Sequence, residues 1–270
     1  MSDADKTRYS TTVFLKAVLP TLKPLVEGKP GLTKLWGSTN GTVQISACAP
    51  DGEFNVNGVQ KDAMHFEITD GALQPRLSAT DYPDFEIEFK SREDLVTFFT
   101  GGLALPKLHG ALKKPQLLVK TIGTLLVLSK LMGATEPPED PDEAALLTKL
   151  MFYLLTTGIS QLNKAGHPKF KKWAKKQPDR VYQLSVQGKP DLAAYVRVKG
   201  GRTRASRGYY KRSRPFFELS FDSVPSALGT LLEIDDMLEA TTAGRILMFG
   251  APEYGADFGD LLLTIGGYAK

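Results

Sequence analysis

Cysteine and histidine are scarce in this sequence, and their scarcity argues against disulfide bonds and metal sites. Of 270 residues, one is a cysteine, Cys48, and three are histidines, His65, His109 and His167. A single thiol excludes an internal disulfide and every site with several cysteine ligands. The histidines stand apart from one another and from any cluster with zinc-ligand spacing, so we predict no metal site.

Long apolar runs and catalytic sequence motifs are missing as well. The longest apolar stretch, which ends in "TLLVLSKLM" (124–132), is interrupted by Lys130 and is too short to cross a bilayer. The opening "MSDADKTRYS" carries acids and no apolar core, unlike a signal peptide. No Gly-x-Ser-x-Gly elbow, Walker loop or Rossmann fingerprint occurs. We expect a cytoplasmic protein that is not an enzyme and has no catalytic residue and no cofactor.

Acidic pairs do occur, and we expect them at the surface. Glu86 and Glu88 alternate with apolar residues, so they share the polar face of one predicted strand. His65 alternates in the same way in "MHFEI" and should also face solvent. Asp235 and Asp236 form a second acidic pair. Charged residues of this kind are usually exposed to solvent, so these acidic pairs do not support a hydrolytic function.

The composition is that of an ordinary globular protein, but the sequence repeats itself at about half its length. Hydrophobic residues make up 42% and charged residues 24%, with a net charge of +4. The phrase "YPDFEIEFKS" (82–91) returns as "RPFFELSFDS" (214–223). The identical pairs are Pro83/Pro215, Phe85/Phe217, Glu86/Glu218, Phe89/Phe221 and Ser91/Ser223.

Neighbouring segments repeat in the same order. Residues 94–99 match 227–232, 123–128 match 259–264, and 25–36 match 162–173, which places Trp36 opposite Trp173. Four blocks in one order predict an internal duplication. Between the copies, residues 133–143 hold three prolines and several acids, a composition typical of a solvated linker. We expect one domain at 1–135 and a second at 140–270, a pseudo-dimer within one chain, and leave the oligomeric state open.

Both halves are predicted to contain the same elements in the same order, with an α+β fold. The leading helices are 13–26, broken by Pro20 and Pro24, and 143–164, which is apolar nearly all round and must be covered on more than one side. The strands are 42–48, 63–71, 72–79 and 84–90, then 181–187, 193–201, 202–210, 215–222 and 245–252. Closing helices at 125–132 and 258–268 complete two tandem copies of a mixed or antiparallel five-stranded sheet covered by helices. No strand is predicted near 112–121.

This order resembles the sterol carrier protein type two domain. The resemblance is carried by "FEIEFKSREDLVTFFTGGL" (85–103), where Ser91 and Asp94 also have the form of a capping box, and by "GRILMFGAPEYGADFGDLLLTI" (244–265). It implies a sheet covered by helices, with an apolar tunnel that binds sterols, fatty acids, acyl-coenzyme A esters or phospholipids without a cofactor. Some members of that family are interaction modules with no known ligand.

The residues that would line such a cavity lie on the matching helices and on the last strand. Any one of them could instead fill the core, because close packing is the rule in protein interiors. They are Phe98, Phe99, Leu103, Leu125, Leu128 and Met132 in the first copy, and Leu231, Leu232, Met237, Leu238, Met248, Leu262, Ile265 and Tyr268 in the second.

The most polar feature is the segment 197–214, "RVKGGRTRASRGYYKRSR", here called the basic ribbon. A turn at Gly200–Gly201 would place most of its cations on the polar face of a hairpin. Its interpretation stays open between a solvated face, docking on anionic lipid or an acyl-coenzyme A phosphate, and binding of nucleic acid. The cations are Arg197, Lys199, Arg202, Arg204, Arg207, Lys211, Arg212 and Arg214.

Overall fold

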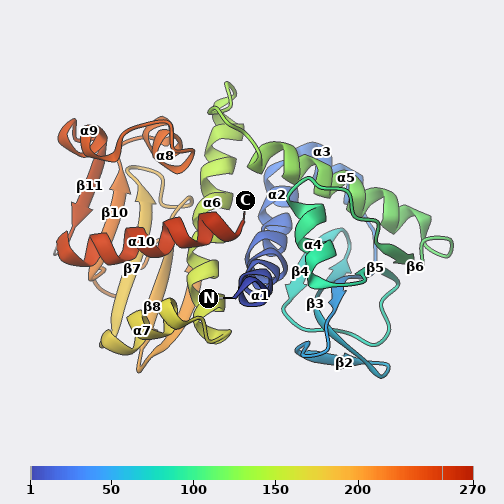
Figure 1. The fold of residues 1–270 in the computed structure, drawn as a ribbon. Helices are drawn as coiled ribbons and strands as arrows, with labels where there is room; N and C mark the ends of the chain where they lie inside the picture. The colour runs from blue at the N-terminus through green and yellow to red at the C-terminus, as the bar shows by residue number, and fades with distance from the viewer. Residues whose placement is uncertain (1, 251, 270) are drawn as a thin grey trace. The chain divides into compact units, whose positions relative to one another are not determined.

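A computed structural model describes residues 2–250 and 252–269, which form two compact units (Figure 1). Unit 1 is built from the chain up to Ser129 together with the C-terminal residues from Tyr268 on, and unit 2 extends from Lys130 to Gly267. The division falls a few residues before the proline-rich segment 133–143. Each unit is described by itself below.

Unit 1 is built on a mixed sheet. Its strands are β1 (Gly41–Cys48), β2 (Phe54–Val56), β3 (Val59–Thr69), β4 (Ala72–Arg76), β5 (Phe85–Phe89) and β6 (Lys107–His109). They lie in the order β2-β3-β1-β5-β6, with β4 beside β3. The pair β1 and β5 is parallel, whereas the other pairs are antiparallel.

Unit 2 repeats this pairing pattern. Its strands are β7 (Arg180–Val186), β8 (Ala194–Lys199), β9 (Arg202–Arg207), β10 (Phe217–Phe221) and β11 (Ile246–Phe249), in the order β11-β10-β7-β8-β9. Again the central pair, β7 and β10, is parallel. Two mixed sheets covered by helices confirm the predicted α+β class, although the first sheet has six strands among the described residues instead of five.

The parallel central pair explains how one face of each sheet is covered. The strands β1 and β5 are parallel neighbours, which a tight hairpin cannot join. The chain leaves β4 on the other side of β1 and therefore crosses one face of the sheet before it enters β5. In unit 1 the crossing segment contacts the polar face, where the backbone N–H of Thr80 donates to Gln44 Oε1 at 2.7 Å. In unit 2 Tyr210 donates in the same way to Gln183 Oε1 at 2.8 Å. Each polar face is therefore partly covered by a loop, which contacts the central glutamine of the sheet.

Helices cover the apolar face of the unit 1 sheet. They are α1 (Asp3–Val13), a π-helical turn (Phe14–Val18), a 3-10 turn (Leu19–Thr21), α2 (Leu22–Gly28), α3 (Pro30–Trp36), α4 (Arg92–Phe99) and α5 (Pro115–Met132). The predicted break in the leading helix is confirmed, and its irregular part includes Pro20, which has no N–H to continue an α-helix. Trp36 Nε1 donates to Thr124 Oγ1 at 3.0 Å and fixes α3 against α5.

In unit 2 the helices are α6 (Pro141–Lys164), α7 (Pro168–Lys176), α8 (Val224–Leu231), α9 (Met237–Thr242) and α10 (Pro252–Tyr268). The prediction of a buried helix at 143–164 is confirmed, because α6 is covered along most of its length. It packs on β9, where Ser160 Oγ donates to the carbonyl oxygen of Thr203 at 3.0 Å. On another side it contacts α10 so closely that a Cβ on Gly158 would lie 2.8 Å from Ile265 Cγ2.

Some elements of unit 1 differ from the prediction. The short strands β2 and β6 were not predicted, and α5 begins at Pro115, ten residues before the predicted start at 125. Proline is tolerated in the first helical turn, so "KKPQLL" can start this helix.

By length and composition alone, α5 and α6 could each cross a membrane, with 33% and 78% of the apolar window buried within the protein. The larger buried share of α6 is typical of a core helix.

Candidate functional site

A buried trio of polar side chains occupies the centre of the polar face in unit 1. Gln44 and Ser46 extend from β1, and both donate to Glu86 Oε1 on β5, at 2.9 and 2.6 Å. The parallel register places Gln44 directly opposite Glu86. Glu86 is only 7% exposed, so its predicted solvent exposure is wrong. The crossing loop described above accounts for the burial.

Unit 2 contains the same trio with the same geometry. Gln183 and Ser185 on β7 donate to Glu218 Oε1 on β10, again at 2.9 and 2.6 Å. Here a further donor is present, because the hydroxyl of Tyr209 lies 3.1 Å from Glu218 Oε2. Glu218 is 8% exposed. The two sheets thus share one arrangement of glutamine, serine and glutamate at their centres.

Unit 1 adds a buried ammonium group to its trio. Lys61 Nζ on β3 donates to Glu86 Oε1 at 3.1 Å and also to Glu88 Oε2, which like Glu86 was wrongly predicted to face solvent. Burial would raise the pKa of Glu88, but the hydrogen bond from Lys61 and its charge outweigh burial and lower that pKa. Burial likewise opposes the charge of Lys61, yet the hydrogen bond to Glu88 and the charge of Glu86 raise its pKa. Lys61 and Glu88 are therefore ionised and paired at neutral pH.

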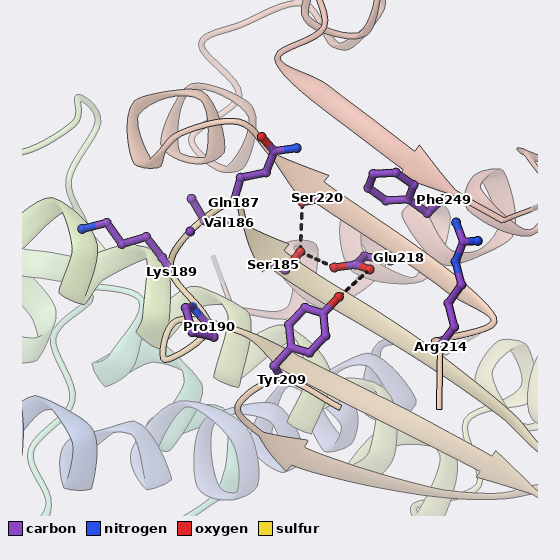
Figure 2. A pocket seen from close by; sticks show the side chains of 11 residues that line it. Ser185, Val186, Gln187, Lys189, Pro190, Tyr209, Arg214, Glu218, Ser220 and Phe249 are labelled. Atoms are coloured by element: carbon purple, nitrogen blue, oxygen red, sulfur yellow. Dashed lines mark hydrogen bonds between the residues drawn. The ribbon is translucent and has the colours of Figure 1, made fainter. Parts of the chain in front are cut away.

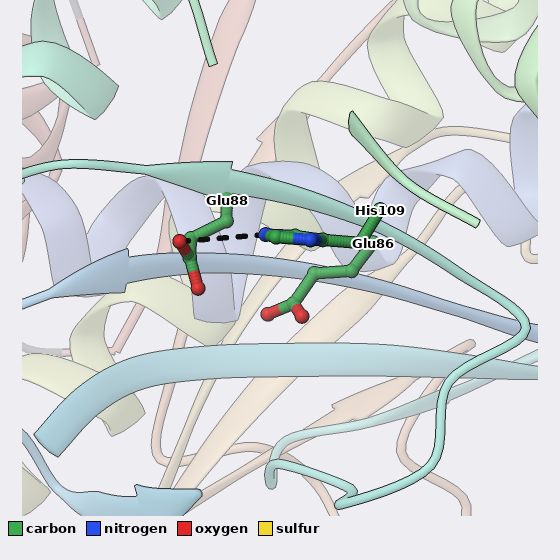
Figure 3. A group of neighbouring side chains, drawn as sticks. All are labelled: Glu86, Glu88 and His109. Atoms are coloured by element: carbon green, nitrogen blue, oxygen red, sulfur yellow. Dashed lines mark ion pairs between the residues drawn. The ribbon is translucent and has the colours of Figure 1, made fainter. Parts of the chain in front are cut away.

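His109 on β6 completes a group with Glu86 and Glu88 in which one oxygen or nitrogen atom of each side chain lies within 4.8 Å of the other two (Figure 3). Such a group could hold a metal ion in another protein. Here Lys61 already supplies a positive charge to both carboxylates, so their burial is compensated without an ion.

The remaining predicted surface groups have structural roles. His65 is buried instead of facing solvent, and its Nδ1 lies 2.6 Å from the carbonyl oxygen of Ser78 in the crossing loop. Asp235 forms an ion pair with Arg245 at 2.6 Å. Asp236 caps the N-terminus of α9. None of these three contacts indicates catalysis.

A pocket of about 400 Å³ opens beside the trio of unit 2 (Figure 2). Glu218, Ser185 and Ser220 form its floor, and Tyr209 hydrogen-bonds to Glu218 along one side. Burial and the charge of Glu218 raise the pKa of Tyr209, which therefore stays protonated and donates. The rim consists of the turn after β7 on one side and of Arg214 and Phe249 on the other.

A second pocket, of about 190 Å³, lies on the same polar face within the basic ribbon. Tyr195, Arg197, Arg204, Ser206, Tyr210 and Arg212 line it. Arg197 and Arg204 are directly opposite each other on β8 and β9. Arg197 makes two hydrogen bonds to Asp179, at 3.0 and 2.7 Å, and Tyr195 packs edge-on against Tyr210. The predicted hairpin is confirmed, and the structure brings three of its arginines together.

The other ribbon cations are placed differently. Lys199 and Arg202 pair across the end of the hairpin, on the same face as Arg197. Arg207 lies on the opposite face, where its guanidinium packs 4.9 Å from the centre of the Tyr153 ring. Lys211, Arg212 and Arg214 are exposed in the loop after β9. Nothing in these positions tests whether the ribbon binds an anion.

The apolar candidates of unit 1 fall into two groups. Leu125 and Leu128 are buried on α5. Phe98 and Phe99 are half-buried at the end of α4, where Phe99 stacks on Phe14 with ring centres 5.3 Å apart and Phe98 lies equally close to Phe89. Leu103 is 92% exposed, and Met132 is half-buried.

The apolar candidates of unit 2 are also divided. Ile265 is buried on α10, and Leu231, Leu232 and Leu262 are half-buried. Tyr268, predicted with the second copy, is buried too but belongs to unit 1. Leu238 and Met248 are exposed. The side chain of Met237 lies outside the described part of the structure, as does Ala251 of the predicted strand 245–252. The two pockets above are lined by other residues, so the apolar lining stays a prediction.

Comparison with known proteins gives weak similarities. No protein-family model matches the chain, and no curated protein matches it significantly. The solution structure of TT1886 from Thermus thermophilus, a conserved hypothetical protein and suggested sterol carrier protein, is 16% identical over 41% of this chain and 80% of that chain, with a TM-score of 0.28. The inverting sec-alkylsulfatase Pisa1 from Pseudomonas sp. is 12% identical over 63% of this chain and 31% of its own, with a TM-score of 0.25. Neither neighbour identifies the family of this chain.

Proposed function

We propose that the protein is a cytoplasmic, non-enzymatic carrier that binds a hydrophobic ligand such as a sterol, a fatty acid, an acyl-coenzyme A ester or a phospholipid. The observation that supports this proposal is a leucine segment in unit 1, between α4 and α5. It consists of Leu103, Leu105, Leu108 and Leu112, which are 92%, 81%, 43% and 99% exposed.

The leucine segment directly continues a layer of aromatic rings. Phe98 and Phe99 end α4 only a few residues earlier, and each keeps part of its surface accessible. Phe98, Phe99 and Phe89 contact one another at the apolar face of the sheet. A hydrophobic chain bound at this point would contact both the accessible rings and the exposed leucines.

The energetics favour such a ligand. Isolated apolar side chains at a surface are common, but four exposed leucines within one short segment are not. Full burial of one leucine side chain is worth about 1.5–3 kcal/mol, and part of this is lost to ordering of the segment and the ligand. A fatty acyl chain covering two or three leucines would therefore bind with useful affinity.

Native mass spectrometry of the purified protein and titration with a fluorescent fatty acid test this proposal. We expect a co-purifying lipid and saturable binding, and the double variant Leu103→Ser/Leu105→Ser should weaken the binding at least about tenfold. The matched control is Leu263→Ser, which removes an exposed leucine of α10 in unit 2 that is not among the predicted lining residues. Absence of lipid together with absence of saturable binding would contradict the carrier function.

A second candidate function is supported by the basic ribbon, which would contact nucleic acid or an anionic surface. Two arginines directly opposite each other repel, and Asp179 is bonded to Arg197 but not shown bonded to Arg204. A phosphate between them would relieve this repulsion, and the adjacent tyrosines could stack on bases.

Gel-shift and vesicle-sedimentation assays at increasing salt test this candidate. Binding should fall steeply with salt and should be lost in Arg202→Glu/Arg204→Glu/Arg212→Glu. The control variant Lys171→Glu/Lys172→Glu/Lys176→Glu makes the same charge change on α7 and should bind normally. No binding to either partner at low salt would eliminate this function.

A further inference from the structure

Unit 2 has an open pocket where unit 1 has a lysine ammonium group. The two positions can be compared directly because the central strands share one register, in which Gln44 pairs with Glu86 as Gln183 pairs with Glu218. In both units the same carboxylate oxygen accepts from the glutamine and from the serine at equal distances. The two carboxylates are therefore in equivalent places on their sheets.

In unit 1, Lys61 fills the space beside this carboxylate. Lys61 lies opposite Cys48 at the end of β1 and reaches back over the polar face. Its Nζ donates to Glu86 and to Glu88, two residues further along β5. The buried carboxylates thus have a cation built into the chain.

Unit 2 has neither of these two partners. By register, the residue that matches Cys48 is Gln187, which already lies beyond the end of β7. Strand β8 begins only at Ala194, so no strand residue stands at the position of Lys61. The residue that matches Glu88 is Ser220. The shorter connection leaves the carboxylate accessible from the pocket (Figure 2).

The floor of the pocket is a carboxylate with neutral partners only. Gln183, Ser185 and Tyr209 donate to Glu218, and within residues 2–250 and 252–269 no ion pair joins Glu218 to a cation. A buried carboxylate is stabilised by a positive charge more than by neutral donors. The cationic rim residues are Lys189, which points away from the pocket, and Arg214, which lies near the Phe249 ring, 6.0 Å from its centre (Figure 2).

We propose that this pocket binds a small zwitterion with a primary ammonium group, which occupies on Glu218 the place that Lys61 Nζ occupies on Glu86. A primary ammonium has three N–H donors, for which Glu218 and the hydroxyl oxygens of Ser185 and Ser220 are suitably placed acceptors. Arg214 at the rim would repel a simple cation but attract an anionic group at the other end of the ligand. Amino acids and aminoalkyl phosphates share this chemistry.

This inference does not rest on the carrier function, because the leucine segment belongs to unit 1 and to its apolar side. Loss of fatty-acid binding would leave the zwitterion pocket untouched. Loss of zwitterion binding would likewise leave the carrier function untouched.

A ligand panel titrated into the full chain by calorimetry tests the inference. Glycine represents the amino acids and phosphoethanolamine represents the aminoalkyl phosphates. Tighter binding of one of them shows which of the two ligand classes the pocket prefers. Phosphocholine, which has no N–H donor, and ethyl phosphate, which has no ammonium, should bind at least about tenfold more weakly. Equal binding of ethyl phosphate, or no binding of either zwitterion, would overturn the proposal.

Two variants locate the binding at Glu218. Glu218→Gln keeps the shape and removes the charge, and should weaken binding by at least about tenfold, whereas the matched variant Glu86→Gln in unit 1 should leave it unchanged. Ser220→Glu recreates the carboxylate pair of unit 1 and should tighten binding by about tenfold. If Glu218→Gln does not fold, Ser220→Glu carries the test, and unchanged or weaker binding there contradicts the proposal.

Discussion

At the scale of single residues, the buried cluster of Lys61, Glu86 and Glu88 links the charge of three side chains to the stability of the protein. Strand alternation correctly predicts that the two glutamates share a face, as their common contact with Lys61 shows. It does not predict that the face is buried, because burial comes from a loop that crosses the sheet. Sequence periodicity shows which side chains lie together on a strand and not what covers them.

Lys61→Met should destabilise the protein by about 3–5 kcal/mol at pH 7, since it leaves two buried carboxylates without their cation. Urea denaturation measures this change. The control is Arg76→Gln, which removes an exposed partner of Glu67 and should leave the free energy of unfolding nearly unchanged. The double variant Lys61→Met/Glu88→Ser copies unit 2 and should recover much of the loss. Equal effects of Lys61→Met and Arg76→Gln would contradict the buried pairing.

The pH dependence of this effect has a definite sign. The pKa of Glu88 is lowered from 4.5, so its contribution to stability is present above pH 4.5 and is lost as the pH falls through the lowered pKa. The pKa of Lys61 is raised from 10.5, so its contribution is present below pH 10.5 and is lost as the pH rises through the raised pKa. The difference between wild type and Lys61→Met should be largest between these limits and should shrink outside them.

At the scale of secondary-structure elements, the helices follow local sequence signals closely. Ser91 caps α4 by accepting from Asp94 N at 3.1 Å, and Ser223 caps α8 in the same way through Ser226 N. Such caps can be read from sequence because their partners are three residues away. The contact of α6 with α10 could not be predicted, because Gly158 and Ile265 are far apart in the chain and a glycine has no side chain to form a pattern.

Gly158→Val should destabilise unit 2 by about 1–3 kcal/mol, because the added side chain would overlap Ile265. Ile265→Ala should cost about 2–5 kcal/mol through the cavity it leaves. In the double variant the new side chain fills that cavity, so the combined loss in unfolding free energy should be smaller than the sum. Gly259→Ala, where a methyl group meets no neighbour, serves as the control and should stabilise α10. Strict additivity would show that the two helices are not in contact.

At the scale of the whole molecule, the chain contains the same strand order twice. The sequence blocks predicted two similar halves, and the sheets show the same central parallel pair in each unit. The sequence did not predict that unit 1 has a lysine beside its buried glutamate whereas unit 2 has a pocket. The length of the β1–β3 connection sets the strand register, and this register places Lys61 within reach of Glu86. Pairing across strands depends on these lengths and not on residue types alone.

Hydrogen exchange should be slowest in the four central strands β1, β5, β7 and β10. Both β5 and β10 are buried at every position and pair on two sides, whereas β2, β6 and β11 are short edge strands. Central strands open only in the largest unfolding events. Mass spectrometry of exchanged peptides measures these rates, and fast exchange in 85–89 or 217–221 would contradict the central position of those strands.

Cys48, the chain's single cysteine, ends β1 half-buried and directly opposite Lys61. Burial and the charge of Glu88 raise the pKa of its thiol, and a protonated thiol reacts slowly with electrophiles. The rate of alkylation consequently reports how often this end of the central strand β1 opens. Since no second thiol adds to the signal, the native chain carries its own site-specific sensor of disturbances in its first half.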